Sequence, residues 1–498
     1  MSKMIRTALG VIEGFVQNQV EKYLGIPFAE PPVGALRFKT AVAKQPWDGI
    51  LQAKGFRKDP IQLNLIRDFS HYSEDCLYLN IWVPAERDEK LPVMVWIPGG
   101  AYANGGAGCD VPEGPAMYDG TRIAADAQAV VVSVSYRLNA FGFLNLHRYA
   151  EELDDHVGMK DIIEALRWVR QNIAAFGGDP ENVTLFGESA GGGAISALLF
   201  CDEAKPYFDK AIIESNCWES FYDEEMEDMV CRKYLEFCGL TTEEAADIRK
   251  LSYEQLGEAH KKLDQYMFND YFLRCSFAPV IDGVFLREFP TLSAMEQQDK
   301  AVLVGSNHDE GYFQVLAYQI GPDRTERLRD VLMQLVPEED RKRLLSAYHF
   351  PAWEALGDLL TDVMYTFPKI RFAEHMSRAG KAPVYVYRYD YVTPFQKKYH
   401  MKACHVSELL ALFPVVTSPF GDWGRGDEEQ LEKIGRRMRR YFGAFARSGK
   451  PEAEGLTEWL PYDEKDRHTL VIAEEDRLEK DPEGEVRRLY EGIDRVEI

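Results

Sequence analysis

Residues 182–199 read NVTLFGESAGGGAISALL, and this stretch decides the fold that the rest of the chain must support. Residues 182–186 carry no charge and are mostly β-branched, aromatic or apolar, which is typical of a short buried strand. Residues 191–199 begin with small side chains and continue as an apolar helix. A strand, a sharp turn and a helix around Gly-x-Ser-x-Gly form the setting of a nucleophile elbow. The sequence therefore predicts that Ser189 is an exposed, activated serine.

Strand candidates alternate with helical segments through the first two hundred residues, and further strands follow later in the chain. Runs that are apolar throughout suit strands that are buried on both faces of a parallel sheet. The pattern predicts an α/β fold with a large, mostly parallel central sheet flanked by helices. Besides residues 182–186, the predicted strands are 93–97, 129–134, 211–213, 301–305 and 384–387.

Helical patterns fill much of the remaining sequence. Apolar residues recur every three or four positions from Met159 to Phe176, which predicts one helix that ends at the following glycine pair. Residues 220–275 and 320–375 are helical and rich in charge, so we expect them to be cap insertions over the active site. The tail after Asp463 carries many charges of both signs and is expected to form exposed helix and turns. No repeat or linker marks a boundary, so residues 1–498 are expected to form a single domain.

The composition excludes several classes of partner. The 498 residues carry a net charge of −23, which argues against nucleic acid and anionic membrane surfaces. No stretch approaches the ~18 apolar residues of a membrane span, and the first 30 residues lack the pattern of a signal peptide. The eight cysteines show no zinc-ligand spacing. We therefore expect a cytoplasmic protein that holds no metal.

A serine hydroxyl becomes a good nucleophile when a base takes its proton and an acid orients that base. In hydrolases with a nucleophile elbow, the acid and then the histidine follow the serine in the chain. Glu310 lies in a turn-rich segment just after a predicted strand, where catalytic groups of parallel sheets gather. His405 lies in a short loop before an apolar helix, with His400 as a rival base. Many carboxylates and seven histidines follow Ser189, so these residue patterns alone leave the choice open.

Several further motifs occur in one order along nearly the whole chain. They include SEDCLYLNIW at residues 73–82, FGGDP at 176–180, APVIDG at 278–283 and DEG at 309–311. With the GESAG elbow, they resemble the type-B carboxylesterase family of α/β-hydrolases, which includes the cholinesterases and the bacterial para-nitrobenzyl esterases. The resemblance implies a serine carboxylesterase that hydrolyses short-to-medium acyl or aryl esters through an acyl-enzyme intermediate. It implies a small-molecule ester as substrate, no cofactor, and a monomer or homodimer.

The resemblance also assigns roles to single residues. Carried over position by position, Ser189 is the nucleophile, Glu310 the acid and His405 the base. The backbone N–H groups of the oxyanion hole come from Gly100, Ala101 and Ala190.

Two neighbouring positions are expected to support this triad. Glu188 directly precedes the nucleophile, and Ser215 falls where the family often has a serine close to the acid.

The sequence departs from the family pattern at a few informative positions. Pro98 stands where His or Tyr is common, and Ala101 stands where a glycine is common. Val406 replaces the glycine that usually follows the catalytic histidine. Cys76 has no cysteine upstream, so the disulfide of secreted members cannot form. Residues 65–68 lack the tryptophan on which choline recognition depends, so acetylcholine is not expected as a substrate. The intact triad argues against the alternative of a non-catalytic adhesion protein.

Aromatic residues in and near the expected caps form a further group with a candidate role in the substrate pocket, although core packing is their commoner fate. The group consists of Tyr266, Phe268, Tyr271, Phe272, Tyr312 and Phe313.

Overall fold

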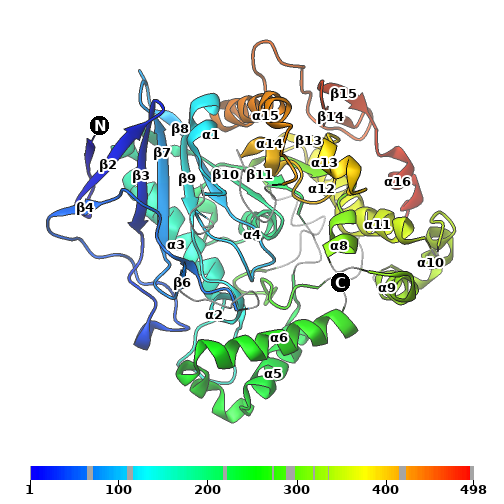
Figure 1. Cartoon of the computed structure of the whole chain (residues 1–498), viewed down its shortest axis with the longest axis horizontal. Coiled ribbons are helices and arrows are strands. Elements are labelled where there is room, and N and C mark those ends of the chain that lie inside the picture. The colour runs from blue at the N-terminus through cyan, green and yellow to red at the C-terminus, as the bar shows by residue number, and fades with distance from the viewer. Residues whose placement is uncertain are drawn as a thin grey trace.

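A central sheet of thirteen strands runs through the molecule (Figure 1). The computed structural model describes residues 2–63, 71–108, 116–216, 221–271, 274–287, 298–317, 320–334, 336–350, 352–413 and 422–493. Within these residues the strand order is β1-β2-β3-β7-β9-β8-β10-β11-β12-β13-β14-β15, and β4 pairs with β2. The seven strands from β9 to β14 along this path are parallel neighbours, and antiparallel pairs close both ends. The predicted α/β fold with a mostly parallel sheet is confirmed.

The strands vary in length from two to eleven residues. Residues 182–186 and the five other strands predicted from the sequence all fall on strands of this sheet. The strands are β1 (Ser2–Arg6), β2 (Val11–Gln17), β3 (Val20–Pro27), β4 (Ile50–Gln52), β5 (Asp59–Pro60), β6 (Tyr72–Ser73), β7 (Tyr78–Pro84), β8 (Leu91–Ile97), β9 (Val130–Val134), β10 (Gly178–Glu188), β11 (Lys210–Glu214), β12 (Ala301–Asn307), β13 (Val384–Tyr389), β14 (His468–Ile472) and β15 (Arg477–Lys480).

Helices connect the strands and cover both faces of the sheet. The α-helices are α1 (Thr121–Ala127), α2 (Asn139–Phe143), α3 (Val157–Asn172), α4 (Ala190–Leu199), α5 (Glu224–Cys238), α6 (Tyr253–Asp270), α8 (Tyr312–Ala317), α9 (Pro322–Gln334), α10 (Glu338–Leu345), α11 (Trp353–Thr361), α12 (Phe367–Ala379), α13 (Pro394–Lys398), α14 (Leu409–Leu412), α15 (Glu428–Ser448) and α16 (Gly484–Leu489). Tighter turns form η1 (Gly34–Leu36), η3 (Ile173–Phe176), η4 (Lys205–Tyr207) and η5 (Thr242–Lys250), and η6 (Asp362–Thr366) is a π-helical turn.

Strand β8 shows why the central strands are apolar throughout. Val93, Val95 and Ile97 belong to a core cluster with α3, α4 and α12 on one face of the sheet. Met94 and Trp96 belong to a second cluster with α1, α14 and α15 on the other face. Because both faces of the strand are covered, every side chain of β8 is buried.

Two helical regions lie outside these layers. Residues 220–275 contain α5, η5 and α6. The two long helices, α5 and α6, lie below the sheet in Figure 1. Residues 320–375 contain α9, α10 and α11, which share a separate apolar cluster with α16 at the C-terminal end. Helix α12, which begins within the same range, packs instead against β12 and β13.

The expectation for the tail after Asp463 is wrong in part. Instead of exposed helix and turns alone, this segment supplies β14, which pairs in parallel with β13, and β15, which folds back on it. Leu470, Val471 and Ile472 are fully buried. The surrounding charges belong to the flanking turns and to α16, and they hide a five-residue strand that is too short to stand out in the sequence.

Candidate active site

Ser189 occupies a sharp turn between β10 and α4. Its backbone dihedrals are φ 56° and ψ −124°, a region that non-glycine residues rarely occupy and that costs about 1–3 kcal/mol. The turn needs glycine on both sides, because a Cβ at Gly187 or Gly191 would lie 2.5 Å or 2.0 Å from the carbonyl oxygen of Ile97. The Ser189 N–H donates a hydrogen bond to the carbonyl of Glu214 at 3.0 Å, which ties the turn to β11. The predicted strand–turn–helix setting is therefore present.

The structure brings His405 and Glu310 to this serine from two other parts of the chain. Nε2 of His405 lies 2.9 Å from Oγ of Ser189, and Nδ1 lies 2.6 Å from Oε2 of Glu310. A carboxylate only accepts, so Nδ1 carries a proton toward Glu310, and in the neutral imidazole Nε2 turns its lone pair toward the serine. His400, the rival base, is exposed at the surface.

The loops that carry the acid and the base are joined through their backbones. The N–H of Asp309 donates to the carbonyl of Ala403 at 2.9 Å, and the N–H of His405 donates to the carbonyl of Glu310 at 3.3 Å. Oε1 of Glu310 accepts hydrogen bonds from the backbone N–H of Asn307 at 2.6 Å and from its side-chain amide at 3.2 Å. With one oxygen held by Asn307, Glu310 presents its other oxygen to His405.

Glu188 lies on the opposite side of the imidazole from Glu310. Its Oε1 is 3.1 Å from Nε2 of His405, and the side chain is buried. Burial raises the pKa of Glu188 well above its usual range. Burial by itself lowers the pKa of His405, but the negative charges of Glu188 and Glu310 outweigh it and raise that pKa to about 9. Glu188 and His405 therefore compete for a proton, and an ionised Glu188 stabilises the imidazolium.

Ser215 lies behind the acid, next to Glu408. Its Oγ donates to Oε1 of Glu408 at 2.7 Å and accepts from the side-chain amide of Asn307 at 3.2 Å. The same amide also donates to Oε2 of Glu408. Burial, followed by the charge of Glu310, raises the pKa of Glu408 to about 7. Ser215 thus contacts the triad through Asn307, which sequence reasoning did not single out although it stands three residues before Glu310.

The loop after β8 passes directly against the nucleophile. A Cβ at Gly99 would lie 3.1 Å from Cβ of Ser189. Gly100 and Ala101 have positive φ values of 118° and 55°, and the carbonyl of Gly100 accepts from the N–H groups of Ala103 and Asn104. Within the described ranges, the N–H groups of Gly100 and Ala101 donate to no protein group. Ala190 begins α4, where a first-turn N–H has no partner inside the helix.

Comparison with known proteins decides the family. The model of the Carboxylesterase family matches residues 1–488. The para-nitrobenzyl esterase of Bacillus subtilis (strain 168) is 32% identical over 98% of this chain and 98% of that protein. The acetylcholinesterase of Leptinotarsa decemlineata is 30% identical over 96% of this chain and 84% of that protein. A solved structure of a thermophilic PNB esterase has a TM-score of 0.86 and 32% identity, covering 98% of this chain and 100% of that chain.

The chain belongs to the carboxylesterase family. It has the α/β-hydrolase fold and is a carboxylic ester hydrolase of the serine type that is typical of the family. The resemblance in the motifs and the function that it implies are confirmed.

Two aromatic rings face the imidazole in this carboxylesterase. The ring of Phe313, one of the aromatics considered as pocket residues, lies 5.8 Å from that of His405, and the ring of Tyr365 lies 5.3 Å from it. The amide of Gln314 donates to the Tyr365 hydroxyl at 2.6 Å. Tyr312 instead stacks edge-on against Trp353. Phe272 and residues 65–68, where the choline-binding tryptophan is missing, lie outside the described residues.

A π-helical turn, η6, carries Tyr365. The N–H of Phe367 donates to the carbonyl of Asp362, five residues earlier. Pro368 follows at once and has no N–H to give to the carbonyl of Met364, so the widened turn absorbs a break inside one continuous helical segment. Sequence reasoning missed Tyr365, and a proline within a helical pattern was the signal that could have found it.

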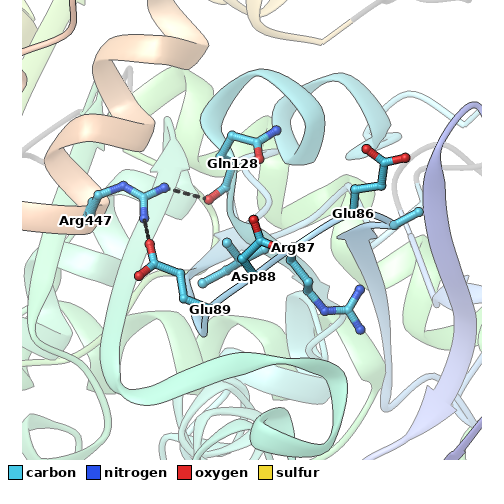
Figure 2. Close-up of a pocket in the computed structure, with 8 residues that line it drawn as sticks. Glu86, Arg87, Asp88, Glu89, Gln128 and Arg447 are labelled. Carbon is cyan, nitrogen blue, oxygen red and sulfur yellow. Dashed lines mark hydrogen bonds and ion pairs between the residues drawn. The ribbon is translucent and has the colours of Figure 1, made fainter.

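A second concave region lies at the other end of β8. This cleft of about 860 Å³ is lined by residues 85–89, Leu91, Gln128 and Arg447 (Figure 2). Arg447 donates to the carbonyl of Gln128 at 3.1 Å and lies 3.6 Å from a carboxylate oxygen of Glu89. Its described lining holds no serine, cysteine or histidine.

Two classes of site are not found in the part of the chain that the structure describes. No group of three or more His, Cys, Asp or Glu side chains is arranged to hold a metal there. None of the described helices is long and apolar enough to cross a membrane.

Proposed function

We propose that Ser189, His405 and Glu310 carry out the ester hydrolysis of this carboxylesterase through an acyl-enzyme intermediate. The observation that supports this most is the pair of short contacts on the imidazole, 2.9 Å to the Ser189 Oγ and 2.6 Å to the Glu310 Oε2. These distances are within hydrogen-bond reach for a base and the group that orients it. The three residues come from separate segments of the chain, so packing of the whole fold is needed to bring them together.

In acylation, a proton moves from Ser189 to His405 and then to the leaving group. His405 takes the proton of Ser189 as the Oγ attacks the ester carbonyl, and Glu310 stabilises the resulting imidazolium. The tetrahedral intermediate places negative charge on the former carbonyl oxygen. When it collapses, the bond to the alcohol breaks, and His405 gives its proton to the leaving alkoxide.

Deacylation repeats the sequence with water as the nucleophile. His405 takes a proton from water, the hydroxide attacks the acyl carbonyl, and the acid leaves as Ser189 regains its proton. The net reaction consumes one ester and one water and releases one acid and one alcohol. No metal or cofactor takes part in either half.

The oxyanion in both halves is stabilised by the N–H groups of Gly100, Ala101 and Ala190. Donors that already point at the developing charge contribute more than donors that must reorganise. The unoccupied N–H groups of the Gly100 loop and its close approach to Ser189 support this assignment. Pro98 lacks an N–H, but it precedes the donor residues and removes none of them.

The substrates that we propose are esters with short-to-medium acyl groups or aryl alcohols. The support is the similarity over nearly the whole chain to an enzyme named for para-nitrobenzyl esters. The aromatic rings of Phe313 and Tyr365 beside His405 offer an apolar wall for such groups.

The proposal also covers the domain organisation, the cellular location and the oligomeric state of the protein. We propose one domain over residues 1–498, in which the helices of residues 220–275 and 320–375 act as the cap. We also propose a cytoplasmic enzyme that is a monomer or homodimer and binds neither nucleic acid nor membranes. The free thiols of the described cysteines, Cys76 among them, are consistent with a reducing compartment. Light scattering on the purified protein will give the oligomeric state.

The test is hydrolysis of para-nitrophenyl acetate, butyrate and octanoate by the wild type and by Ser189→Ala. We expect the variant to lose about a million-fold in kcat, as triad nucleophiles do. Ser196→Ala is the matched control, because Ser196 lies on α4 and donates to the carbonyl of Gly192 rather than contacting His405. Equal activity of Ser189→Ala and wild type would contradict the proposal, and the chain-length profile reports the size of the acyl pocket.

A further inference from the structure

Three buried side chains behind the triad have polar atoms that the protein does not satisfy. Both carboxyl oxygens of Glu214 and the hydroxyls of Tyr387 and Tyr389 have no hydrogen-bond partner among the residues that the structure describes. Each of these side chains is at most 1% exposed. A buried polar group left without a partner costs about 1–3 kcal/mol, so four such atoms in one region call for an explanation.

The strand register places these groups on the same face of the sheet. Glu214 of β11 pairs with Gly305 of β12, and Gly305 pairs with Tyr387 of β13. Tyr389 follows two residues later and therefore points to the same face. Neighbouring strands are about 4.8 Å apart, and the glycine between them leaves the space above β12 open. The Tyr387 ring enters that space, because a Cβ at Gly305 would lie 2.0 Å from its Cε1.

The electrostatics of the three groups also indicate that they are close together. Burial, followed by the charges of Glu408 and Glu188, raises the pKa of Glu214 well above its usual range. Burial and then the charge of Glu214 raise the pKa of Tyr387, and burial and then the charge of Glu408 raise the pKa of Tyr389. Burial therefore favours the protonated form of each of the three groups, which is able to donate as well as accept.

We propose that Glu214 and Tyr387, with Tyr389 at the edge of the site, hold an internal water molecule next to Glu408. A buried water makes about three hydrogen bonds to polar groups that would otherwise be unsatisfied, and these side chains supply that number. The ligand is water because the groups offer both donors and acceptors and are themselves buried from the surface.

This water site reaches the proposed catalytic acid through Glu408, whose hydrogen bonds to the groups around Glu310 are observed. Glu408 accepts from Ser215 and Asn307, and Asn307 donates to the oxygen of Glu310 that faces away from His405. Glu214 and Tyr387 are thus positioning residues that act through Glu408 and Asn307. The inference rests on the proposed function of Glu310 as the acid of the triad.

A crystal structure at a resolution that resolves ordered waters tests the site directly. We expect a water within about 2.7–3.2 Å of both the Glu214 carboxyl and the Tyr387 hydroxyl. A dry contact, in which the two side chains bond each other or nothing, would overturn the proposal. This result does not depend on activity.

A double-mutant cycle tests the link to catalysis. Glu214→Met and Tyr387→Phe each remove a ligand of the same water, so we expect each to lower kcat about tenfold with KM nearly unchanged, and the double variant to be no worse than either single one. Glu214→Gln keeps a donor and an acceptor in the same place and is expected to restore kcat to within about twofold of the wild type. Two results would contradict a shared water: losses in kcat that add up in the double variant, or a kcat of Glu214→Gln as low as that of Glu214→Met.

Two variants away from the site control for general loss of packing. Tyr462→Phe removes another buried hydroxyl without a partner among the described residues, and Glu227→Met removes a buried carboxyl on α5. Neither is expected to lower kcat, whatever its effect on thermal unfolding. If Glu214→Met does not fold, Tyr387→Phe and the crystal structure still decide the proposal. If Ser189→Ala is active, the proposed function itself is wrong. If Ser189→Ala is inactive but the losses in the double-mutant cycle are additive, only the inference about the water is wrong.

Discussion

The two ends of the parallel sheet use the same kind of side chain in opposite ways. At the carboxyl ends of the strands, Glu188 and Glu310 are 2% and 0% exposed and both contact His405. At the amino end of β8, the side chain of Glu89 is 76% exposed in the cleft of Figure 2 and has a long contact with Arg447. Acidic residues are abundant in a chain of net charge −23, but Glu188 and Glu310 are buried against His405, whereas Glu89 is largely exposed to solvent.

This contrast teaches that position in the fold, rather than charge alone, sets the environment and the partners of a carboxyl group. Burial perturbs the protonation of Glu188 and Glu408, and fixed donors such as Asn307 hold Glu310 in one orientation. An exposed carboxylate at the amino end is screened by water and salt, so it has little influence on a neighbour. Substitutions at the two ends should therefore differ by orders of magnitude in their effect on activity.

The largest difference is expected between two histidines five residues apart. His405→Ala removes the base that contacts Ser189 and should lower kcat by about a million-fold, as large as the loss of the nucleophile itself. His400→Ala, at an exposed position of the same segment, should leave kcat within about twofold. Steady-state hydrolysis of para-nitrophenyl butyrate measures both. Comparable losses in the two variants would mean that the imidazole contacts at Ser189 have no catalytic meaning.

The next difference separates buried from exposed acids. Glu310→Gln keeps the shape of the side chain but cannot hold the imidazole in the same tautomer, so kcat should fall by about 10⁴-fold. Glu86→Gln, at the amino-end cleft, is the matched control and should have no measurable effect on kcat. A loss below about tenfold for Glu310→Gln would assign the role of the acid to another carboxylate.

The smallest expected effect concerns stability and pH. Burial raises the pKa of Glu408 to about 7 in the folded protein, from the 4.5 of an unperturbed glutamate. The unfolded chain therefore releases this proton first, and the contribution of Glu408 to stability is lost as the pH rises from about 4.5 to about 7. The loss amounts to about 3 kcal/mol.

Glu408→Gln cannot ionise and should lack this contribution to the decline. Guanidinium unfolding at pH 5 and pH 7.5 should show the variant gaining on the wild type as the pH rises. Glu89→Gln, which replaces an exposed carboxylate, should follow the wild type at both values. A constant difference between Glu408→Gln and the wild type would show that Glu408 ionises normally in the folded protein.

Much of the fold followed from the sequence because the central strands are apolar on both faces. Residues 93–97 and 182–186 stand out for that reason, and they lie on β8 and on β10, respectively, as predicted. Strand β1 was not identified, because its alternation of exposed and half-buried residues gives a weak signal at the edge of a sheet. Strand β14 was missed because its five residues, four of them buried, are enclosed by charged turns. Strand β1 is held by pairing with the adjacent β2, whereas β14 is held by pairing with β13, which is distant in sequence, and neither pairing is revealed by the local pattern.

The candidate site was less accessible from residue patterns alone. The elbow at Ser189 is a local motif, but the positions of Glu310 and His405 had to be carried over from the family resemblance. Asn307 depends on long-range packing and no short motif marks it, whereas Pro368 marks the break in the helix that carries Tyr365 but not the packing of Tyr365 against the imidazole. The row formed by Glu214, Gly305 and Tyr387 appears only when the register of β11, β12 and β13 is known.

Covalent trapping of Ser189 tests the central claim most directly. Diethyl para-nitrophenyl phosphate transfers its diethylphosphoryl group to an activated serine Oγ and releases para-nitrophenolate. Intact-mass analysis followed by peptide mapping should find one such group, on the peptide that contains Ser189, with activity lost in proportion to labelling. Ser189→Ala should remain unlabelled. A label on another residue, or a fully labelled enzyme that stays active, would contradict the account.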